Sequence, residues 1–213
     1  MLRNSEMCSK EKIVIDQFLK LGKGELFCRS DFGIEISDRE LKRILYHFIL
    51  SGEVHIILSK VYYKVEMNKF SQFKNKPLSP DITAVLQTLS RATALKFQEH
   101  GGVAANRIGL STQVPVIHVF YTTGRSREIK LYGQTVRFIR TRCLDVFQYA
   151  HEPVGLAISA LYFLGPKIVD LVIIKQLKKS LGEDNFQKFL KAKKPLWIQK
   201  RILEIKNNIC FLE

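Results

Sequence analysis

Cysteine, tryptophan and acidic side chains are scarce in this chain of 213 residues. It has four cysteines and one tryptophan, and the cysteines form no CxxC pair and have no histidine at zinc-finger spacing. The sequence therefore signals neither a structural metal site nor a disulfide framework. We expect reduced thiols, a cytoplasmic setting, and no metal or other cofactor.

Long hydrophobic runs are also absent. The N-terminus, MLRNSEMCSKEK, lacks the apolar core of a secretion signal. The most apolar segment, VGLAISALYFLGP at 154–166, is shorter than a membrane-spanning helix needs, and Lys167 follows it. We expect this segment to be a buried helix, and we expect no membrane partner.

The shortage of acids leaves a large positive charge. Asp and Glu number 20 against 34 Lys and Arg, which gives a net charge of +14. Residues 1–75 hold 13 basic against 10 acidic side chains, whereas residues 76–213 hold 21 against 10. The balance predicts a polyanionic partner, namely nucleic acid, an anionic membrane surface or an acidic protein.

The first 70 residues alternate helical and strand patterns. Apolar spacing predicts a helix over 9–21 and a brief helix from Ser30. A capping box of Ser37 and Glu40 precedes apolar residues at helical spacing, which predicts a single helix over 38–50. EVHIIL and VYYKV then form a hairpin that turns at Ser59-Lys60. This order is typical of a winged helix-turn-helix, which we expect over residues 1–70.

The helix expected at 38–50 carries basic side chains opposite its apolar face, as a helix that enters the major groove of DNA would. The alternative is a solvated polar face on a module used for protein contacts, and Asp38 and Glu40 favour that alternative. The DNA-binding residues that we predict are Arg39, Lys42, Arg43, Tyr46 and, at the tip of the hairpin, Lys60.

A polar segment at 68–80 with two prolines is the expected domain boundary. A helix then opens at Ser79-Pro80-Asp81, with Ser79 as its cap, and runs to about Thr93. Strand patterns follow in LKFQE, VPVIHVFYT, REIKLY and QTVRFIRT, which we expect to form an antiparallel meander. Helices make up the rest, with breaks at Gly165-Pro166 and after Leu181. The fold class is α+β, and residues 78–213 form a second domain with a small, mainly antiparallel sheet and a helical tail.

The segment GGVAANRIGLSTQVP at 101–115 first suggests a phosphate-binding loop. It contains neither GxxxxGK[ST] nor GxGxxG, so the spacing argues against that function. Its small residues instead predict a short helix packed closely against a neighbour, with Gly109 at the C-terminal end of the helix. Arg107 alone has no evident structural role.

No catalytic set is apparent in the sequence. The five histidines lie far apart, and His118 fits a strand better than a metal site. Asp145 and Glu152 are the one acidic pair that could hold a metal in a nucleic-acid-processing enzyme. This enzyme, and a winged-helix regulator that senses a small ligand, remain alternatives to a non-enzymatic function.

Several of these stretches together resemble AbiEi-type antitoxins of type IV toxin-antitoxin and abortive-infection systems. The resemblance covers about residues 82–140: the helix ITAVLQTLSRAT, the run AANRIGLSTQVP at 104–115, YTTG at 121–124, Ser126-Arg127 and GQT at 133–135. The upstream winged-helix order also matches this family. In contrast, the hairpin tip Leu58-Ser59-Lys60 has less arginine and glycine than the tip we associate with relatives.

The resemblance implies a protein with two functions. Its winged helix would bind inverted repeats in the promoter of its own operon, which suggests two copies on DNA. Its second domain would counteract a nucleotidyltransferase-like toxin encoded nearby, without itself being an enzyme. The partner-binding residues that we predict are Arg107, Ser111, Thr112, Gln113, Arg125 and Arg127. The role of the lysine-rich tail rests on its charge alone.

Overall fold

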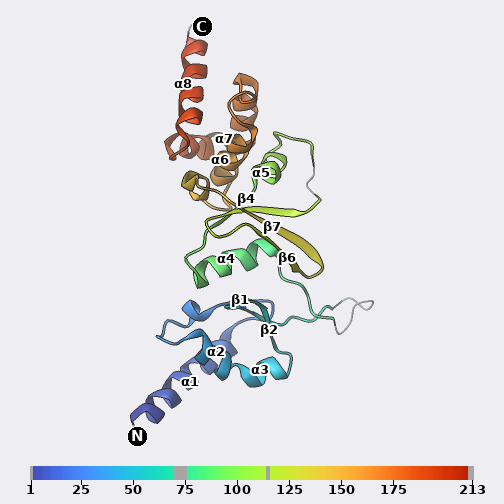
Figure 1. Cartoon of the computed structure of the whole chain (residues 1–213), viewed down its shortest axis with the longest axis vertical. Coiled ribbons are helices and arrows are strands. Elements are labelled where there is room, and N and C mark those ends of the chain that lie inside the picture. Colours follow the sequence, from blue (N-terminus) through green and yellow to red (C-terminus); the bar gives the residue numbers. More distant parts are fainter. Residues whose placement is uncertain (1, 70–75, 114–115, 211–213) are drawn as a thin grey trace. The chain divides into compact units, whose positions relative to one another are not determined.

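The computed structural model of the chain describes residues 2–69, 76–113 and 116–210. The chain divides into two compact units, Met1–Ala94 and Leu95–Glu213. Each unit contains helices and a small sheet (Figure 1), so the expected α+β class is confirmed. The division follows the helix at 82–92, whereas the sequence suggests a boundary within 68–80.

The first unit contains a three-stranded antiparallel sheet in the order β1-β3-β2. In chain order its elements are α1 (Leu2–Lys20), β1 (Leu26–Phe27), the 3₁₀ helix η1 (Arg29–Phe32), α2 (Asp38–Ile44), α3 (Tyr46–Leu50), β2 (Val54–Leu58), β3 (Val61–Lys64) and α4 (Ile82–Ala92). The predicted hairpin is thus present, and α1 begins earlier than the sequence pattern suggests.

The capping box before α2 forms as expected. The Glu40 amide donates to the Ser37 hydroxyl at 3.1 Å, and the Ser37 amide donates to the Glu40 carboxylate at 2.7 Å. The single helix predicted over 38–50 is wrong in one respect, because Leu45 (φ −81°, ψ 3°) separates α2 from α3. Leu45 is fully buried. Its amide still donates to Leu41 and its carbonyl accepts from Ile49, so the break is a local change of backbone angle.

An aromatic cluster forms the core of the first unit. Phe27 stacks on Tyr62 with ring centroids 5.5 Å apart, and Phe18 lies 5.9 Å from Phe27. Leu41 and Leu45 pack into the same cluster, as their helical spacing predicts. Along residues 9–20 of α1, in contrast, the buried residues are Val14 and Phe18, while Ile13 and Leu19 of the expected apolar face are exposed.

The helix α4 packs with the first unit. It contacts β1 and β3, and the Arg91 Nε atom lies 3.2 Å from the Asp31 carboxylate. The predicted cap, Ser79, is wrong, because the Asp81 carboxylate accepts from the Ala84 amide at 3.0 Å. Pro80 therefore precedes the cap instead of occupying the first helical position.

The second unit joins a four-stranded sheet to a group of helices (Figure 1). Its elements are β4 (Phe97–Glu99), α5 (Gly101–Arg107), β5 (His118–Thr122), β6 (Arg127–Leu131), β7 (Gln134–Arg140), the 3₁₀ helix η3 (Leu144–Phe147), α6 (Pro153–Leu164), α7 (Leu171–Lys191) and α8 (Leu196–Cys210).

The sheet is not the predicted meander. Its order is β4-β5-β7-β6, and β5 and β7 are parallel neighbours. Strand β6 lies at the edge, and a turn at Tyr132-Gly133 with positive φ at both residues returns the chain so that β7 enters between β5 and β6. The burial pattern explains this order, because β7 buries Val136 and Phe138 whereas β6 is mostly exposed and charged, which suits an edge strand.

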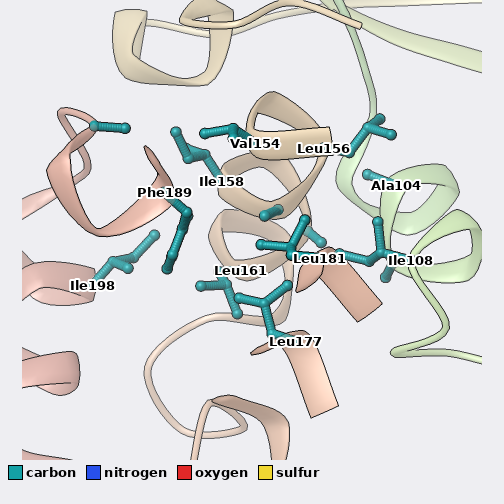
Figure 2. Packing of buried hydrophobic residues seen from close by; sticks show 14 of the residues in the cluster. Ala104, Ile108, Val154, Leu156, Ile158, Leu161, Leu177, Leu181, Phe189 and Ile198 are labelled. Atoms are coloured by element: carbon teal, nitrogen blue, oxygen red, sulfur yellow. The ribbon is translucent and has the colours of Figure 1, made fainter. Parts of the chain in front are cut away.

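The apolar segment predicted as a buried helix is α6, and residues 154–161 are all buried. Figure 2 shows Ala104 of α5 and Ile108, which follows α5, on one side of this helix and Phe189 and Ile198 on the other. The breaks expected at Gly165 and after Leu181 are also present, since Gly182 (φ 71°) interrupts α7. Among the described residues, no helix combines the length and the apolar character needed to cross a membrane.

Candidate functional site

The segment that begins at Gly101 is a packing corner, as its small residues predict. A Cβ atom on Gly101 would lie 2.1 Å from the Phe163 Cβ, so only glycine allows α5 to approach α6 this closely. Gly109 (φ 71°) ends the helix, and the Leu110 amide donates to the Ala105 carbonyl at 2.7 Å. The predicted entry into a strand at Pro115 lies outside the described residues.

Arg107 has a structural role that the sequence does not suggest. Its guanidinium forms an ion pair with Glu99, whose side chain is only 4% exposed, while that of Arg107 is 54% exposed. A buried carboxylate needs a compensating charge. Any contact between Arg107 and a partner would therefore compete with this ion pair.

The three predicted partner-binding residues after α5 differ in their surroundings. Ser111 is half-buried, its carbonyl accepts from the Asn106 side chain at 3.2 Å, and its hydroxyl accepts from the Gln113 amide at 3.2 Å. Thr112 and Gln113 are exposed. The structure thus leaves the side chains of Thr112 and Gln113 available for contact, and gives Ser111 a role in the turn.

Arg125 and Arg127 lie at a cavity of about 420 Å³ in the second unit, where β5 ends and β6 begins. Both side chains are exposed. Its lining residues are Leu95, Phe97, Thr122, Gly124, Arg125, Ser126, Arg127 and Phe138. Of the six predicted partner-binding residues, Arg125 and Arg127 therefore share one concave site. Arg107 does not line it and pairs with Glu99 instead.

The predicted DNA-binding residues on α2 and α3 are all exposed, with Tyr46 at 52%. Arg43 lies 3.8 Å from the Glu11 carboxylate, in a pair that is about half exposed on both sides. Arg39 and Lys42 pair with no carboxylate within the part of the chain that the structure describes. These two cations are therefore the ones most available to an incoming phosphate.

The predicted hairpin-tip residue, Lys60, contacts the start of α2. Its Nζ lies 3.3 Å from the Asp38 carboxylate, which also lies 3.6 Å from the Arg29 Nε. Exposed pairs of this kind contribute about 1 kcal/mol or less, so Lys60 can exchange Asp38 for a phosphate at low cost. Arg29, which we did not predict, adds a further cation beside α2.

A fixed negative charge sits in the first turn of α2. Hydrogen bonds from the Ser37 backbone and hydroxyl hold the pKa of Glu40 below its usual range, and Lys10 and Arg43 lower it further. The carboxylate therefore stays ionised well into the acid range. It repels a nearby phosphate, whereas the exposed Arg39 and Lys42 on the same helix carry the opposite charge.

The lysine-rich tail divides into solvated and structural cations. Lys188, Lys191, Lys193 and Lys200 are exposed. Lys194 is buried, and its ammonium donates to the carbonyls of Phe189, Leu190 and Ala192, where it closes the end of α7. Arg201 donates to the Val169 carbonyl at 2.8 Å.

Asp145 and Glu152 are the acidic pair considered above as metal ligands. Asp145 lies in η3 and Glu152 precedes α6. Over the described residues, no three or more His, Cys, Asp or Glu side chains group closely enough to hold a metal ion. His118 bonds Gln134 across the sheet at 2.6 Å.

Sequence reasoning missed Glu99 and the aromatic side of the cavity. Glu99 stands in a short strand pattern and carries no sign of burial, although it is the acid nearest before Arg107 in the chain. Phe97 and Phe138 were recognisable as strand residues only. Their proximity, with ring centroids 5.4 Å apart, follows from the pairing of β4, β5 and β7.

A family model matches residues 13–189, which is most of the chain, so the protein belongs to DUF6088, a family of unknown function. No curated protein and no solved structure matches it. The family match spans parts of both units and carries no statement about activity.

Proposed function

We propose that this chain is a transcriptional autorepressor and antitoxin, with a winged helix in its first unit and a toxin-counteracting second unit. The observation that carries the first part is the order α1, β1, η1, α2-α3, β2 and β3 around a β1-β3-β2 sheet. Winged helix-turn-helix modules use this order of elements, with the helix before the hairpin as the recognition helix, and here α2 and α3 together occupy that position.

The charge on α2 supports binding to DNA. Arg39 and Lys42 are exposed one turn apart on this helix, and the tip of the β2–β3 hairpin approaches its start through Lys60 and Asp38. Arginine and lysine side chains contribute affinity by neutralising phosphates, and arginine also recognises guanine through two parallel hydrogen bonds. Helix and hairpin tip would thus contact one duplex together.

The antitoxin part rests on the sequence resemblance over residues 82–140 and on the charge of residues 76–213. An excess of 11 basic side chains suits contact with an acidic protein or with a nucleotide or RNA substrate of the toxin. In this proposal Thr112, Gln113, Arg125 and Arg127 supply the contact, because their side chains are exposed.

A mobility-shift assay with the DNA upstream of the operon tests the repressor function. We expect Arg39→Ala/Lys42→Ala to weaken binding at least tenfold and to lower the salt slope by about 2, since two phosphate contacts are lost. Lys20→Ala/Lys23→Ala removes the same charge from the end of α1 and its following loop and should bind almost as well as wild type. If both double variants bind the DNA equally well, the assignment of α2 to the recognition helix is wrong.

Co-expression with the nucleotidyltransferase-like toxin that the resemblance implies tests the antitoxin function. We expect the full chain to restore growth, Arg39→Ala/Lys42→Ala to restore growth without repressing the promoter, and Arg125→Gln/Arg127→Gln to repress without restoring growth. If the wild-type chain leaves growth inhibited, the antitoxin function is wrong, whatever the DNA assay shows.

A further inference from the structure

The cavity between the end of β5 and the start of β6 has two kinds of wall. Leu95, Phe97 and Phe138 form an apolar side, and the turn 124–127 forms a polar side with Arg125 and Arg127. Its volume, about 420 Å³, lies in the range of small-molecule sites, which combine apolar walls with a few directed polar groups.

Arg127 is held in position by an aromatic ring and not by an acidic side chain. Its guanidinium carbon lies 5.8 Å from the centroid of the Phe138 ring, a cation–π contact that leaves the N–H groups free to donate. The adjacent acid, Glu128, forms an ion pair with Arg137 instead. Over the residues that the structure describes, no carboxylate pairs with Arg125 or Arg127.

Further positive charge surrounds this end of the sheet. Arg140 lies opposite Thr122 in the β5–β7 register, and Lys96 and Arg142 lie beside the same strand ends. None of these three side chains forms an ion pair within the described ranges. A group with negative charge would therefore be attracted to the cavity.

The turn that forms the polar wall is fixed by hydroxyl side chains. The Gly124 amide donates to the Thr122 hydroxyl at 3.0 Å, and the Arg140 amide donates to the Ser126 hydroxyl at 2.9 Å. On the other side, the Lys96 amide donates to the Thr123 hydroxyl at 3.0 Å. Binding would thus need little ordering of the backbone, which favours affinity.

We propose that this cavity binds a mononucleotide, with the phosphate at Arg125 and Arg127 and the base along the apolar wall. An inorganic anion alone would leave the apolar wall in contact with water, and an apolar ligand alone would leave two guanidinium groups beside it without a partner. A nucleotide would pair its phosphate with the two arginines and cover the apolar wall with its base. The inference shares Arg125 and Arg127 with the proposed antitoxin function, but it rests on the cavity alone and stands even if the antitoxin function is wrong.

Calorimetric titration of the full chain with AMP, GMP, CMP and UMP tests the proposal. We expect at least one to bind with a dissociation constant below about 1 mM and at least tenfold more tightly than inorganic phosphate or the matching nucleoside. Arg127→Gln should weaken binding about tenfold or more, because it removes charged hydrogen bonds.

Two variants show whether the site is specific. Lys167→Gln removes the same charge from an exposed residue that does not line the cavity, and it should change the affinity less than about threefold. Arg127→Lys keeps the charge but loses the planar fork and the contact with Phe138, so it should bind more weakly than wild type. Thermal unfolding of each variant confirms that it is folded.

Three results would overturn the proposal: binding of none of the four nucleotides, wild-type affinity in Arg127→Gln, or equal affinity for inorganic phosphate and nucleotides. A loss of nucleotide binding in Arg127→Gln with unchanged growth rescue would support the cavity and count against Arg127 as a toxin contact.

Discussion

Single residues in the second unit combine charge and burial in ways that can be tested directly. Glu99 has a nearly buried side chain and Arg107 is its one ion-pair partner among the described residues. His100, next in the chain, accepts a hydrogen bond from the Gly102 amide at 3.2 Å and contacts the rings of Tyr121 and Phe163. Both residues therefore stabilise the corner between β4 and α5.

Removing Arg107 should destabilise the fold. We expect Arg107→Ala to lower the free energy of unfolding by about 1–3 kcal/mol, because the buried Glu99 loses its compensating charge. Arg137→Ala removes the partner of the exposed Glu128 and should cost less than about 1 kcal/mol. Denaturant unfolding measures both, and equal losses in the two variants would contradict the role of burial.

Acid should weaken the corner through His100. Burial lowers the pKa of His100 below the value of about 6.5 that it has when unfolded, so the folded state favours the neutral ring. Its contribution to stability is therefore present above pH 6.5 and is lost as the pH falls towards the lowered pKa. Between pH 7 and pH 5, His100→Asn, which keeps a capping acceptor but does not titrate, should lose less stability than wild type. The same loss in both proteins would contradict this.

At the scale of elements, several caps and turns were predictable, although Ser79 was not the cap of α4, and the strand order of the second sheet was not. The Ser37 capping box, the β2–β3 hairpin and the end of α5 at Gly109 depend on residues close in the chain, whose chemistry the sequence displays. The insertion of β7 between β5 and β6 depends on which strand buries more surface, a comparison across the whole sheet. The same reason hides the ion pairs of Lys60 with Asp38 and of Arg107 with Glu99, and the proximity of Phe97 and Phe138.

The start of α2 offers a test of one predicted element. Ser37→Ala should lower the free energy of unfolding by about 1 kcal/mol, because the Glu40 amide loses its acceptor. Ser59→Ala, in the exposed hairpin turn, should change it by less than about 0.5 kcal/mol. Chemical denaturation of the three proteins measures the difference, and an unaffected Ser37→Ala would show that the cap contributes nothing.

At the scale of the whole molecule, the net charge of +14 and the location of specific contacts are separate properties. Most of the excess lies in residues 76–213, including the exposed tail residues Lys188, Lys191 and Lys200, whereas the proposed recognition helix lies in the first unit. Charge outside the proposed recognition helix should raise affinity for any duplex without distinguishing one sequence from another.

A tail variant can separate these two contributions. We expect Lys188→Gln/Lys191→Gln/Lys200→Gln to weaken binding to a scrambled duplex at about 50 mM salt while the ratio of operator to scrambled affinity stays constant. Arg39→Ala/Lys42→Ala should instead lower that ratio. Fluorescence anisotropy at two salt concentrations measures both quantities, and a changed ratio in the tail variant would assign sequence recognition to the tail.

The central position of β7 also has a consequence for synthesis of the protein. Strand β5 can pair with β4 as soon as both have left the ribosome, but its other edge stays open until residue 140 has emerged, because β6 is not its neighbour. An open strand edge can pair with other chains. A nascent chain that pauses between residues 122 and 140 therefore exposes one edge of β5, and the hairpin of β6 and β7 must form and insert as a unit to close the sheet.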